Sequence, residues 1–252
     1  EPVFLPAEKS THFFPDLDAL EPELLDRTSA FYLCNPSNPQ GTVADATYLK
    51  AALNLARKHD FMLIVDECYS EIYDQTPPTG ILEICAEEGS ALDHVLAFHS
   101  LSKRSSAAGI RSGFCVGETS LIQTFLNLRS FSGAASPLPV CAAAAALWND
   151  DAHVKENRAL YRAKFDMAEE IFGTNFGFYR PEGGFFLWLD VGDGVEAAKR
   201  LWTGAAIRVL PGRYLSVAGA DGINPGDPYI RVALVAEPEN SKEALSRLAN
   251  SL

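Results

Sequence analysis

The sequence predicts an α/β fold with a mostly parallel sheet, followed by a smaller α+β domain. Three short apolar runs rich in β-branched and aromatic residues support this prediction, AFYLC (30–34), FMLIV (61–65) and VLAFH (95–99). Between the first two runs, apolar residues recur at helical spacing over 49–56. A strand, a helix and a second strand in this order are typical of a parallel sheet with crossover helices. The run GFCVG (113–117) predicts a further strand.

The pattern of the sequence changes near residue 150. The elements expected after this point are a long amphipathic helix at 150–172, a strand in 183–191, a helix near 195–203, a strand in 229–234 and a final helix. We therefore expect a first domain over residues 1–148 and a smaller α+β domain over residues 149–252.

Composition and charge narrow the class of protein. The chain has 252 residues, 47% of them hydrophobic and 21% charged, so it can bury a sizeable core and is neither disordered nor fibrous. The formal net charge of -12 argues against nucleic acid or a membrane surface as a partner, because both attract basic proteins. A small anionic substrate stays compatible with this charge if a few cations are concentrated at one site.

The five cysteines are scattered and odd in number, and no CxxC pair occurs among them. This pattern indicates neither a disulfide framework nor a metal site, and it predicts a reducing, cytoplasmic location. The apolar stretch PLPVCAAAAALW (137–148) is too short to span a bilayer, and we interpret it as a buried helix. The opening EPVFLPAEKS looks like a strand entered within a domain, so we expect an N-terminal part of the protein to be missing from this chain.

Polar segments follow each of the first three predicted strands. The first strand continues into NPSNPQG (35–41), the second into DECY (66–69) and the third into SLSK (100–103). In open parallel sheets ligands bind outside the carboxyl ends of the strands, so we expect these segments to converge at one edge.

Each of these segments also has an ordinary explanation. Asn-Pro pairs with a glycine commonly form turns, and Asp66 at a strand end can cap a following helix. Lys103 can be an ordinary solvated charge, as most lysines are. The combination is more specific, because the segments occur in a fixed order and Arg111 follows Lys103 by eight residues in GIRSG.

These four motifs together resemble the class I and II aminotransferases of pyridoxal-phosphate (PLP) fold type I. The family's motifs are Asn-Pro-x-Asn-Pro-x-Gly, Asp-x-x-Tyr, Ser-x-Ser-Lys and a glycine-flanked arginine, and all four are present. The resemblance extends over nearly the whole chain, including 181–188, 210–212 and 229–234. It implies a large domain with a mostly parallel seven-stranded sheet and helices on both faces. This chain would hold the C-terminal portion of that domain and the small C-terminal domain, and the protein would be a homodimer.

The resemblance also assigns catalytic roles. Lys103 matches the lysine that forms a Schiff base with PLP and then shuttles the proton between the substrate Cα and the cofactor. Asp66 matches the carboxylate that keeps the pyridine nitrogen protonated. Tyr69 and Asn38 match the two residues that hydrogen-bond the phenolic oxygen of the ring.

Cofactor phosphate and substrate carboxylate each require cations or hydrogen-bond donors. Ser100, Ser102 and Arg111 align with the phosphate-binding residues of the family. Arg231, in YIRVAL, aligns with the arginine that binds the substrate α-carboxylate, beside which Asn38 is also expected. The ring-stacking aromatic residue, the glycine-rich helix start and the tyrosine from across the dimer are not found here, because in the family they precede the point where this chain begins.

The substrate is predicted from a resemblance to one branch of this family. The run SLSKRSSAAGIRSGF (100–114) and the opening EPVFLP look most like the succinyldiaminopimelate aminotransferases of bacterial lysine biosynthesis. That reaction exchanges an amino group between glutamate and N-succinyl-2-amino-6-oxopimelate. Two alternatives stay open, namely a β-lyase or cyclopropane-forming synthase with the same cofactor arrangement, and an aminotransferase-like effector domain of a transcription regulator.

Overall fold

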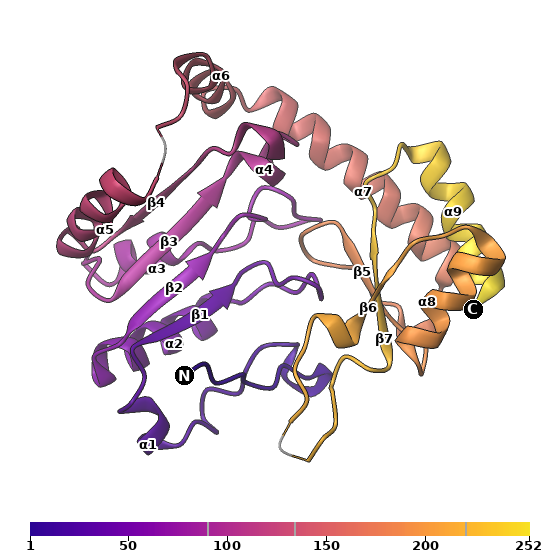
Figure 1. Ribbon diagram of the computed structural model, residues 1–252, viewed down its shortest axis with the longest axis horizontal. Helices are drawn as coiled ribbons and strands as arrows, with labels where there is room; N and C mark the ends of the chain where they lie inside the picture. Colours follow the sequence, from indigo (N-terminus) through magenta and orange to yellow (C-terminus); the bar gives the residue numbers. More distant parts are fainter. Residues whose placement is uncertain (90, 134, 220) are drawn as a thin grey trace. The chain divides into compact units, whose positions relative to one another are not determined.

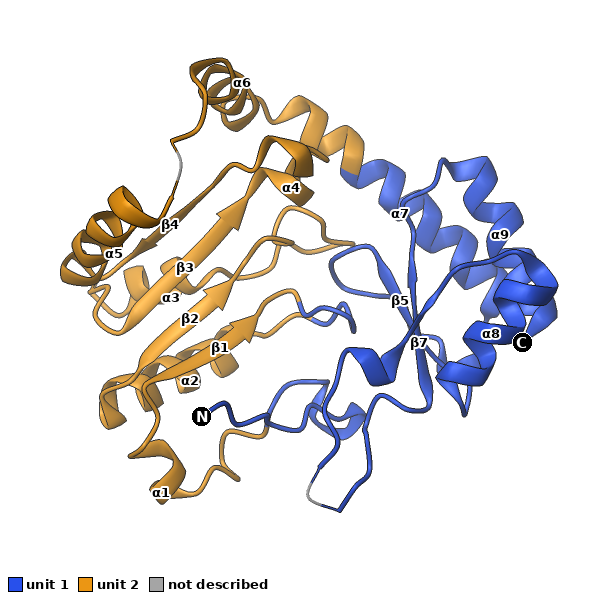
Figure 2. Ribbon diagram, viewed as in Figure 1, with its two compact units in different colours: residues 1–15, 37–42, 158–252 blue, residues 16–36, 43–157 orange. Residues whose placement is uncertain are grey.

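The computed structural model of the chain describes residues 1–89, 91–133, 135–219 and 221–252 (Figure 1). These residues form two compact units (Figure 2). Unit 1 consists of Glu1–Pro15, Ser37–Thr42 and Arg158–Leu252, and unit 2 consists of Asp16–Pro36 and Val43–Asn157. The division into domains at 1–148 and 149–252 stays a prediction. Within the described ranges, no helix is both long and apolar enough to cross a membrane.

The elements of unit 2 include a four-stranded sheet with strand order β1-β2-β3-β4. Its strands are β1 (Ala30–Cys34), β2 (Met62–Asp66), β3 (Val95–Ser100) and β4 (Gly113–Gly117). Its helices are α1 (Pro22–Leu25), α2 (Ala46–His59), α3 (Ile81–Glu87), α4 (Leu101–Arg104), η2 (Ala108–Ile110), α5 (Thr119–Ser132) and α6 (Leu138–Trp148). Strands β1, β2 and β3 are parallel, which confirms the predicted parallel sheet, whereas β4 runs antiparallel to β3.

Helix α2 is the crossover between β1 and β2. Its apolar residues Leu49, Ala52, Leu53 and Ala56 are all fully buried, as their helical spacing predicted. The helix begins at Asp45, whose carboxylate accepts a hydrogen bond of 2.7 Å from the backbone N–H of Tyr48. This crossover places the carboxyl ends of β1 and β2 at the same edge of the sheet.

Unit 1 contains a three-stranded antiparallel sheet with strand order β5-β7-β6. Its strands are β5 (Phe186–Asp190), β6 (Leu210–Pro211) and β7 (Tyr229–Ala233). Its helices are η1 (Lys9–Thr11), η3 (Asn175–Gly177), α8 (Gly194–Ala205), η4 (Gly212–Tyr214) and α9 (Pro238–Ser251). The long helix α7 (Ala152–Phe172) enters both units, because unit 2 ends at Asn157 and unit 1 resumes at Arg158.

The core of unit 1 lies between its sheet and its helices. Phe165 and Phe172 from α7, Leu201 from α8 and Leu245 from α9 are buried together with the apolar side chains of β5 and β7. The strands and helices predicted after residue 150 are confirmed. Arg231 is carried by β7, the central strand, and its position is therefore set by hydrogen-bonded strands on both sides.

The alanine-rich helix α6 differs from its prediction. The segment is helical, as alanine's high helix propensity favours, but it is not a buried helix. Ala144 is its only buried residue, and Leu138 at its N-terminal end is 84% exposed. Alanine forms helices whether or not its small side chain is covered, so a high alanine content predicts the helix but not its burial.

Candidate functional site

The carboxyl ends of the three parallel strands meet at one edge of the sheet in unit 2. Cys34 at the end of β1 pairs with Asp66 at the end of β2, which in turn pairs with Phe98 in β3. The backbone N–H of Asn35 donates to the carbonyl of Asp66 at 3.0 Å. The predicted convergence of the segments that follow these strands is therefore confirmed for Asn35, Asp66 and the end of β3.

Asp66 lies at the end of β2 with its side chain exposed. Its Oδ1 accepts a hydrogen bond of 3.0 Å from the backbone N–H of Cys68, which fixes the carboxylate at the strand end. The chain continues in turns, and the next helix begins only at Ile81. Asp66 is therefore not a helix cap, and its charge is presented at the edge of the sheet.

Lys103 is carried by the one-turn helix α4, directly after β3. Ser100 caps this helix, since its Oγ accepts from the backbone N–H of Ser102 at 3.1 Å and is hydrogen-bonded to the Ser102 hydroxyl at 3.0 Å. The Lys103 Nζ lies 5.8 Å from the centroid of the buried Tyr69 ring. The amine, two hydroxyls and the tyrosine therefore belong to one local structure.

Arg111 follows the 3-10 helix η2 and has a left-handed backbone, with φ of 56°. Its side chain is exposed, and Nη1 donates to the carbonyl of Ala108 at 2.9 Å. The next residue, Ser112, accepts hydrogen bonds at its carbonyl from the backbone N–H of Leu101 at 3.1 Å and from Ser100 Oγ at 3.3 Å. The loop that carries Arg111 is thus tied to the start of the Lys103 helix.

A cavity of about 290 Å³ opens beside these residues. It is lined by Glu67, Cys68, Ser70, Glu71, His99, Ser100, Arg104, Phe114 and Trp148. Glu67 is only 3% exposed, and its carboxylate contacts the His99 ring at 3.0 Å and accepts from the backbone N–H of Ile81 at 2.7 Å. The His99 ring stacks on Phe114 at 4.9 Å. Sequence reasoning missed this pair, because residues 32 positions apart give no local signal.

The thiol of Cys68 has a raised pKa, which makes it unreactive as a nucleophile at neutral pH. Burial, followed by the hydrogen bond with Asp66 and the charge of that carboxylate, raises the pKa of Cys68 to about 12. At neutral pH the group is a protonated thiol and not a nucleophile. Its part in the site is to pack beside Asp66.

Arg231 and Asn38 lie together in unit 1. The Arg231 Nη1 donates to the Oδ1 of Asn38 at 2.9 Å, and the guanidinium carbon lies 4.3 Å from the centroid of the Phe186 ring. The guanidinium is therefore held by a hydrogen bond and by the face of an aromatic ring.

The segment that carries Asn38 is fastened to the C-terminal half of the chain. The carbonyl of Gly41 accepts from the backbone N–H groups of Glu182 and Gly183 at 2.8 and 2.9 Å. A side chain at Gly41 would meet the Gly183 carbonyl at 2.8 Å, and φ there is 74°, so this close approach requires glycine. The motif at 35–41 is thus divided, with Asn35 in unit 2 and Asn38 in unit 1.

The predicted site residues therefore fall into two groups. Unit 2 holds Asp66, Tyr69, Ser100, Ser102, Lys103 and Arg111, and unit 1 holds Asn38 and Arg231. The first group supplies a carboxylate, an amine, a phenol, hydroxyls and a guanidinium around the end of β2 and β3. This donor set fits PLP, because the aldehyde needs an amine, the pyridinium a carboxylate and the phosphate cations and hydroxyls.

Comparisons with known proteins agree with this chemistry. The sequence profile of the family described as "Aminotransferase class I and II", whose members use PLP, matches residues 1–248. The chain is 36% identical over 220 residues to the Streptomyces rimosus 4-dedimethylamino-4-oxo-anhydrotetracycline transaminase OxyQ, covering 86% of this chain and 58% of that protein. It is 32% identical over 255 residues to the putative aminotransferase AatC of Rhizobium meliloti, covering 97% of this chain and 60% of that protein. The chain thus spans less than two thirds of the length of these curated relatives.

Solved structures share the fold. An aminotransferase from Neisseria meningitidis superimposes with a TM-score of 0.89 at 40% identity, over 97% of this chain and 62% of that one. A Thermus thermophilus protein described as a "probable N-succinyldiaminopimelate aminotransferase" gives a TM-score of 0.87 at 26% identity, over 99% of this chain and 65% of that one. The α/β architecture of PLP fold type I is thereby confirmed, and the chain belongs to the class I and II aminotransferases.

Proposed function

We propose that the protein is a PLP-dependent transaminase in which Lys103 holds the cofactor. The observation that carries this proposal is the position of the Lys103 amine beside Tyr69, on a helix capped by Ser100 at the edge of the sheet where Asp66 also lies. When bound, PLP supplies an electron sink for the bonds at the substrate Cα. The residues of this chain then have to hold the cofactor, orient the substrate and move one proton.

In this proposal Lys103 is both the attachment point and the proton carrier. Its Nζ takes the proton from the substrate Cα and returns it on the cofactor side, which requires an amine that is held in place but not paired permanently. Tyr69 lies under this amine and would donate a hydrogen bond to the ring oxygen. Asp66 would keep the ring nitrogen protonated, and Ser100, Ser102 and Arg111 would bind the phosphate.

Arg231 is proposed to bind the α-carboxylate of the substrate. A guanidinium fork matches the two oxygens of a carboxylate, provided that its plane is fixed before the substrate arrives. The hydrogen bond to Asn38 and the ring of Phe186 supply this orientation.

Glutamate is the proposed amino donor, and N-succinyl-2-amino-6-oxopimelate in lysine biosynthesis is the proposed acceptor. The residues that follow Lys103, RSSAAGIRSGF, support this branch, as does the similarity to the Thermus thermophilus protein. The chain is also 29% identical to an LL-diaminopimelate aminotransferase from Nitratidesulfovibrio vulgaris, over 99% of this chain and 64% of that protein. We further propose a homodimer in a reducing cytoplasm, where the five cysteines would stay reduced thiols, outside any disulfide, as they are here.

The function is tested by absorbance spectra of the intact protein with PLP, before and after glutamate is added. Wild type should show the visible band of lysine-bound PLP, and glutamate should convert it to the band of the amine form of the cofactor. Lys103→Ala should show neither, whereas Lys50→Ala, which removes an exposed lysine paired with Glu88 on α2, should behave as wild type. Absence of the lysine-bound band in wild type would contradict the proposal.

The acceptor is tested by product analysis. N-succinyl-2-amino-6-oxopimelate should regenerate the lysine-bound band faster than pyruvate, oxaloacetate or aromatic 2-oxo acids. Ammonia and pyruvate released from a β-substituted amino acid, without the amine form of the cofactor, would instead favour a β-lyase. A lysine-bound band that no amino acid changes would favour a sensor domain.

A further inference from the structure

Arg104, the residue after Lys103, is one of the few buried charged side chains in the described part of the chain, with 6% of its surface exposed. It ends the four-residue helix α4. A helix of this length has almost no stability of its own, because nucleation costs more than a single turn returns. The direction of the Lys103 side chain therefore depends on the contacts that hold this turn in place.

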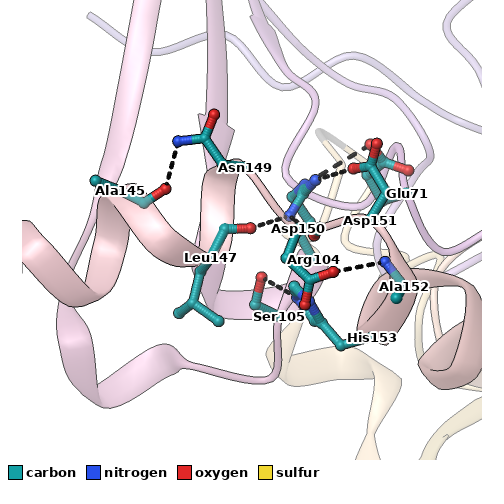
Figure 3. Close-up of polar contacts among 10 residues, drawn as sticks. All are labelled: Glu71, Arg104, Ser105, Ala145, Leu147, Asn149, Asp150, Asp151, Ala152 and His153. Carbon is teal, nitrogen blue, oxygen red and sulfur yellow. Dashed lines mark hydrogen bonds and ion pairs between the residues drawn. The ribbon is translucent and has the colours of Figure 1, made fainter.

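The guanidinium of Arg104 joins this turn to the end of α6. It donates to the carbonyl of Leu147 at 2.7 Å, to the carbonyl of Asp150 at 3.4 Å and to the Asp151 carboxylate at 2.5 Å, and its Nε lies 3.8 Å from the Glu71 carboxylate (Figure 3). Its central carbon lies 5.3 Å from the centroid of the Trp148 ring. The carbonyl of Leu147 is one of the last in α6, where it also accepts from the backbone N–H groups of the residues that follow the helix, Asn149 and, at 3.5 Å, Asp150. A cation at this end is also favoured by the helix dipole.

A second connection runs through the neighbouring residue, Ser105. Its hydroxyl contacts the His153 ring Nε2 at 2.8 Å, and the other ring nitrogen of His153 contacts the Asp150 carboxylate at 2.8 Å (Figure 3). The same carboxylate accepts from the backbone N–H of Ala152 at 2.8 Å, at the start of α7. The turn 101–105 is thus attached at two points to the α6–α7 junction, residues 147–153.

These attachments define where Lys103 points. Successive residues of a helix project about 100° apart, so a fixed Arg104 directs Lys103 to a different side of the turn. There its Nζ lies over the Tyr69 ring, at 5.8 Å from the centroid. We propose that Arg104 is a positioning residue for the reaction, which holds the Lys103 turn against the α6–α7 junction and so fixes the amine. This inference rests on the proposed role of Lys103 in binding PLP.

The geometry of the contacts requires arginine. Only a guanidinium can reach a carbonyl and a carboxylate with separate N–H groups while its face lies on an indole ring. A lysine keeps the charge but loses the fork. A reacting group displaced by about 1 Å can lower a rate by about 100-fold, so a small rearrangement of this turn is measurable.

Three variants of the intact protein test the proposal, with a fourth as a matched control. Arg104→Met removes the charge and the fork, Arg104→Lys removes only the fork, and Asp151→Asn removes the carboxylate charge but keeps an oxygen acceptor. The control is Arg57→Met, because the Arg57 guanidinium likewise contacts a backbone carbonyl, that of Ala91 at 3.1 Å, and a carboxylate, that of Asp93 at 3.1 Å, but lies on α2, away from the Lys103 turn in the sequence.

Two quantities are measured. The first is the rate at which the lysine-bound band appears after PLP is mixed with the cofactor-free protein, together with the apparent pKa of that band. Arg104→Met should slow the appearance by about 10- to 100-fold relative to Arg57→Met and shift the apparent pKa, with smaller changes of the same sign in Arg104→Lys and Asp151→Asn. The second is hydrogen–deuterium exchange of the cofactor-free protein. Exchange should rise in 101–106 and 147–153 in Arg104→Met, and in neither segment in Arg57→Met.

The proposal is overturned if Arg104→Met and Arg57→Met form the band at the same rate and with the same apparent pKa. If Arg104→Met does not fold, Arg104→Lys and Asp151→Asn decide, and equality of both with Arg57→Met overturns the proposal. If wild type forms no band, the proposed function fails. Hydrogen exchange in the cofactor-free protein then still decides the inference, since unchanged exchange in 101–106 would show that Arg104 does not hold this turn.

Discussion

Arg231 and Asn38 are 193 residues apart in the sequence, and they share a hydrogen bond of 2.9 Å between Nη1 and Oδ1. Asn38 comes from the loop that follows β1, whereas Arg231 lies in the central strand β7 of the unit 1 sheet. The asparagine therefore fixes one arm of the guanidinium fork that is proposed to bind the substrate carboxylate.

Asn38→Ala should weaken binding of the amino donor more than it slows turnover. A hydrogen bond to a charged group contributes about 1.5–3 kcal/mol, and the exposure of Asn38 favours the lower end, so we expect a roughly tenfold rise in KM for glutamate. Asn38→Asp should raise KM further, because its carboxylate would compete with the substrate for Arg231. Steady-state kinetics measure both, and a fall in kcat with unchanged KM would contradict the assignment.

Asp66→Asn should weaken PLP binding while the fold stays intact. The asparagine oxygen can still accept from the backbone N–H of Cys68, but the negative charge is lost. An ion pair at about 4 Å contributes about 1 kcal/mol in water and about 4 kcal/mol at an effective dielectric near 20, so the Kd for PLP should rise roughly 5- to 1000-fold.

Asp190→Asn is the matched control for this change. Asp190 also ends a strand, has an exposed side chain and accepts a backbone hydrogen bond two residues on, from Gly192 at 3.2 Å. Fluorescence titration with PLP should give the wild-type Kd for this control. An equal loss of affinity in both variants would remove the specific role of Asp66.

Cys68 should resist alkylation at neutral pH. Its pKa is raised to about 12 by burial and by Asp66, so the reactive thiolate is scarce until the pH rises toward that value. Cys141, which has an exposed side chain, serves as the internal reference. Iodoacetamide labelling followed by peptide mass spectrometry at increasing pH should modify Cys141 first. Asp66→Asn should speed the labelling of Cys68, because it removes a negative charge that raises the pKa.

Asp193→Ala should destabilise unit 1 whether or not a cofactor is bound. The Asp193 carboxylate accepts from the backbone N–H groups of Val195 and Glu196, both at 3.0 Å, and so begins α8. Loss of such a cap costs about 1 kcal/mol of unfolding free energy. Urea denaturation should show this loss in Asp193→Ala and little of it in Asp193→Asn, which keeps the oxygen. An unchanged midpoint in Asp193→Ala would contradict the cap.

The sequence predicts those features that depend on local periodicity. Apolar runs and the spacing of the buried residues of α2 predict strands, helices and the parallel sheet, because burial of one face imposes a period on the chain. The direction of β4 is not predicted, since GFCVG reads the same in a parallel or an antiparallel pairing. The burial of α6 is predicted wrongly, because its composition describes the helix and not its surroundings.

The part of the candidate site that the sequence predicts is the part that lies at the ends of strands. Asp66 and Ser100 end the strands β2 and β3, and Lys103 follows β3 by three residues, so sheet topology alone brings this part of the chain to one edge. The burial of Arg104 is not visible in the sequence, where an arginine beside a lysine looks like a solvated charge. Its hydrogen-bond acceptors in the α6–α7 junction lie 43 to 47 residues away, and the Glu71 carboxylate, 3.8 Å from its Nε, lies 33 residues away, so only the folded chain brings these groups together.

The most direct test of the account is to identify the residue that holds PLP. The intact protein is incubated with PLP, treated with sodium borohydride to fix the cofactor to the amine that carries it, digested and mapped by mass spectrometry. We expect one stoichiometric pyridoxyl group on Lys103, in the peptide that contains SLSKR, and none in Lys103→Ala. A stoichiometric label on another lysine, or no label in wild type, would contradict it.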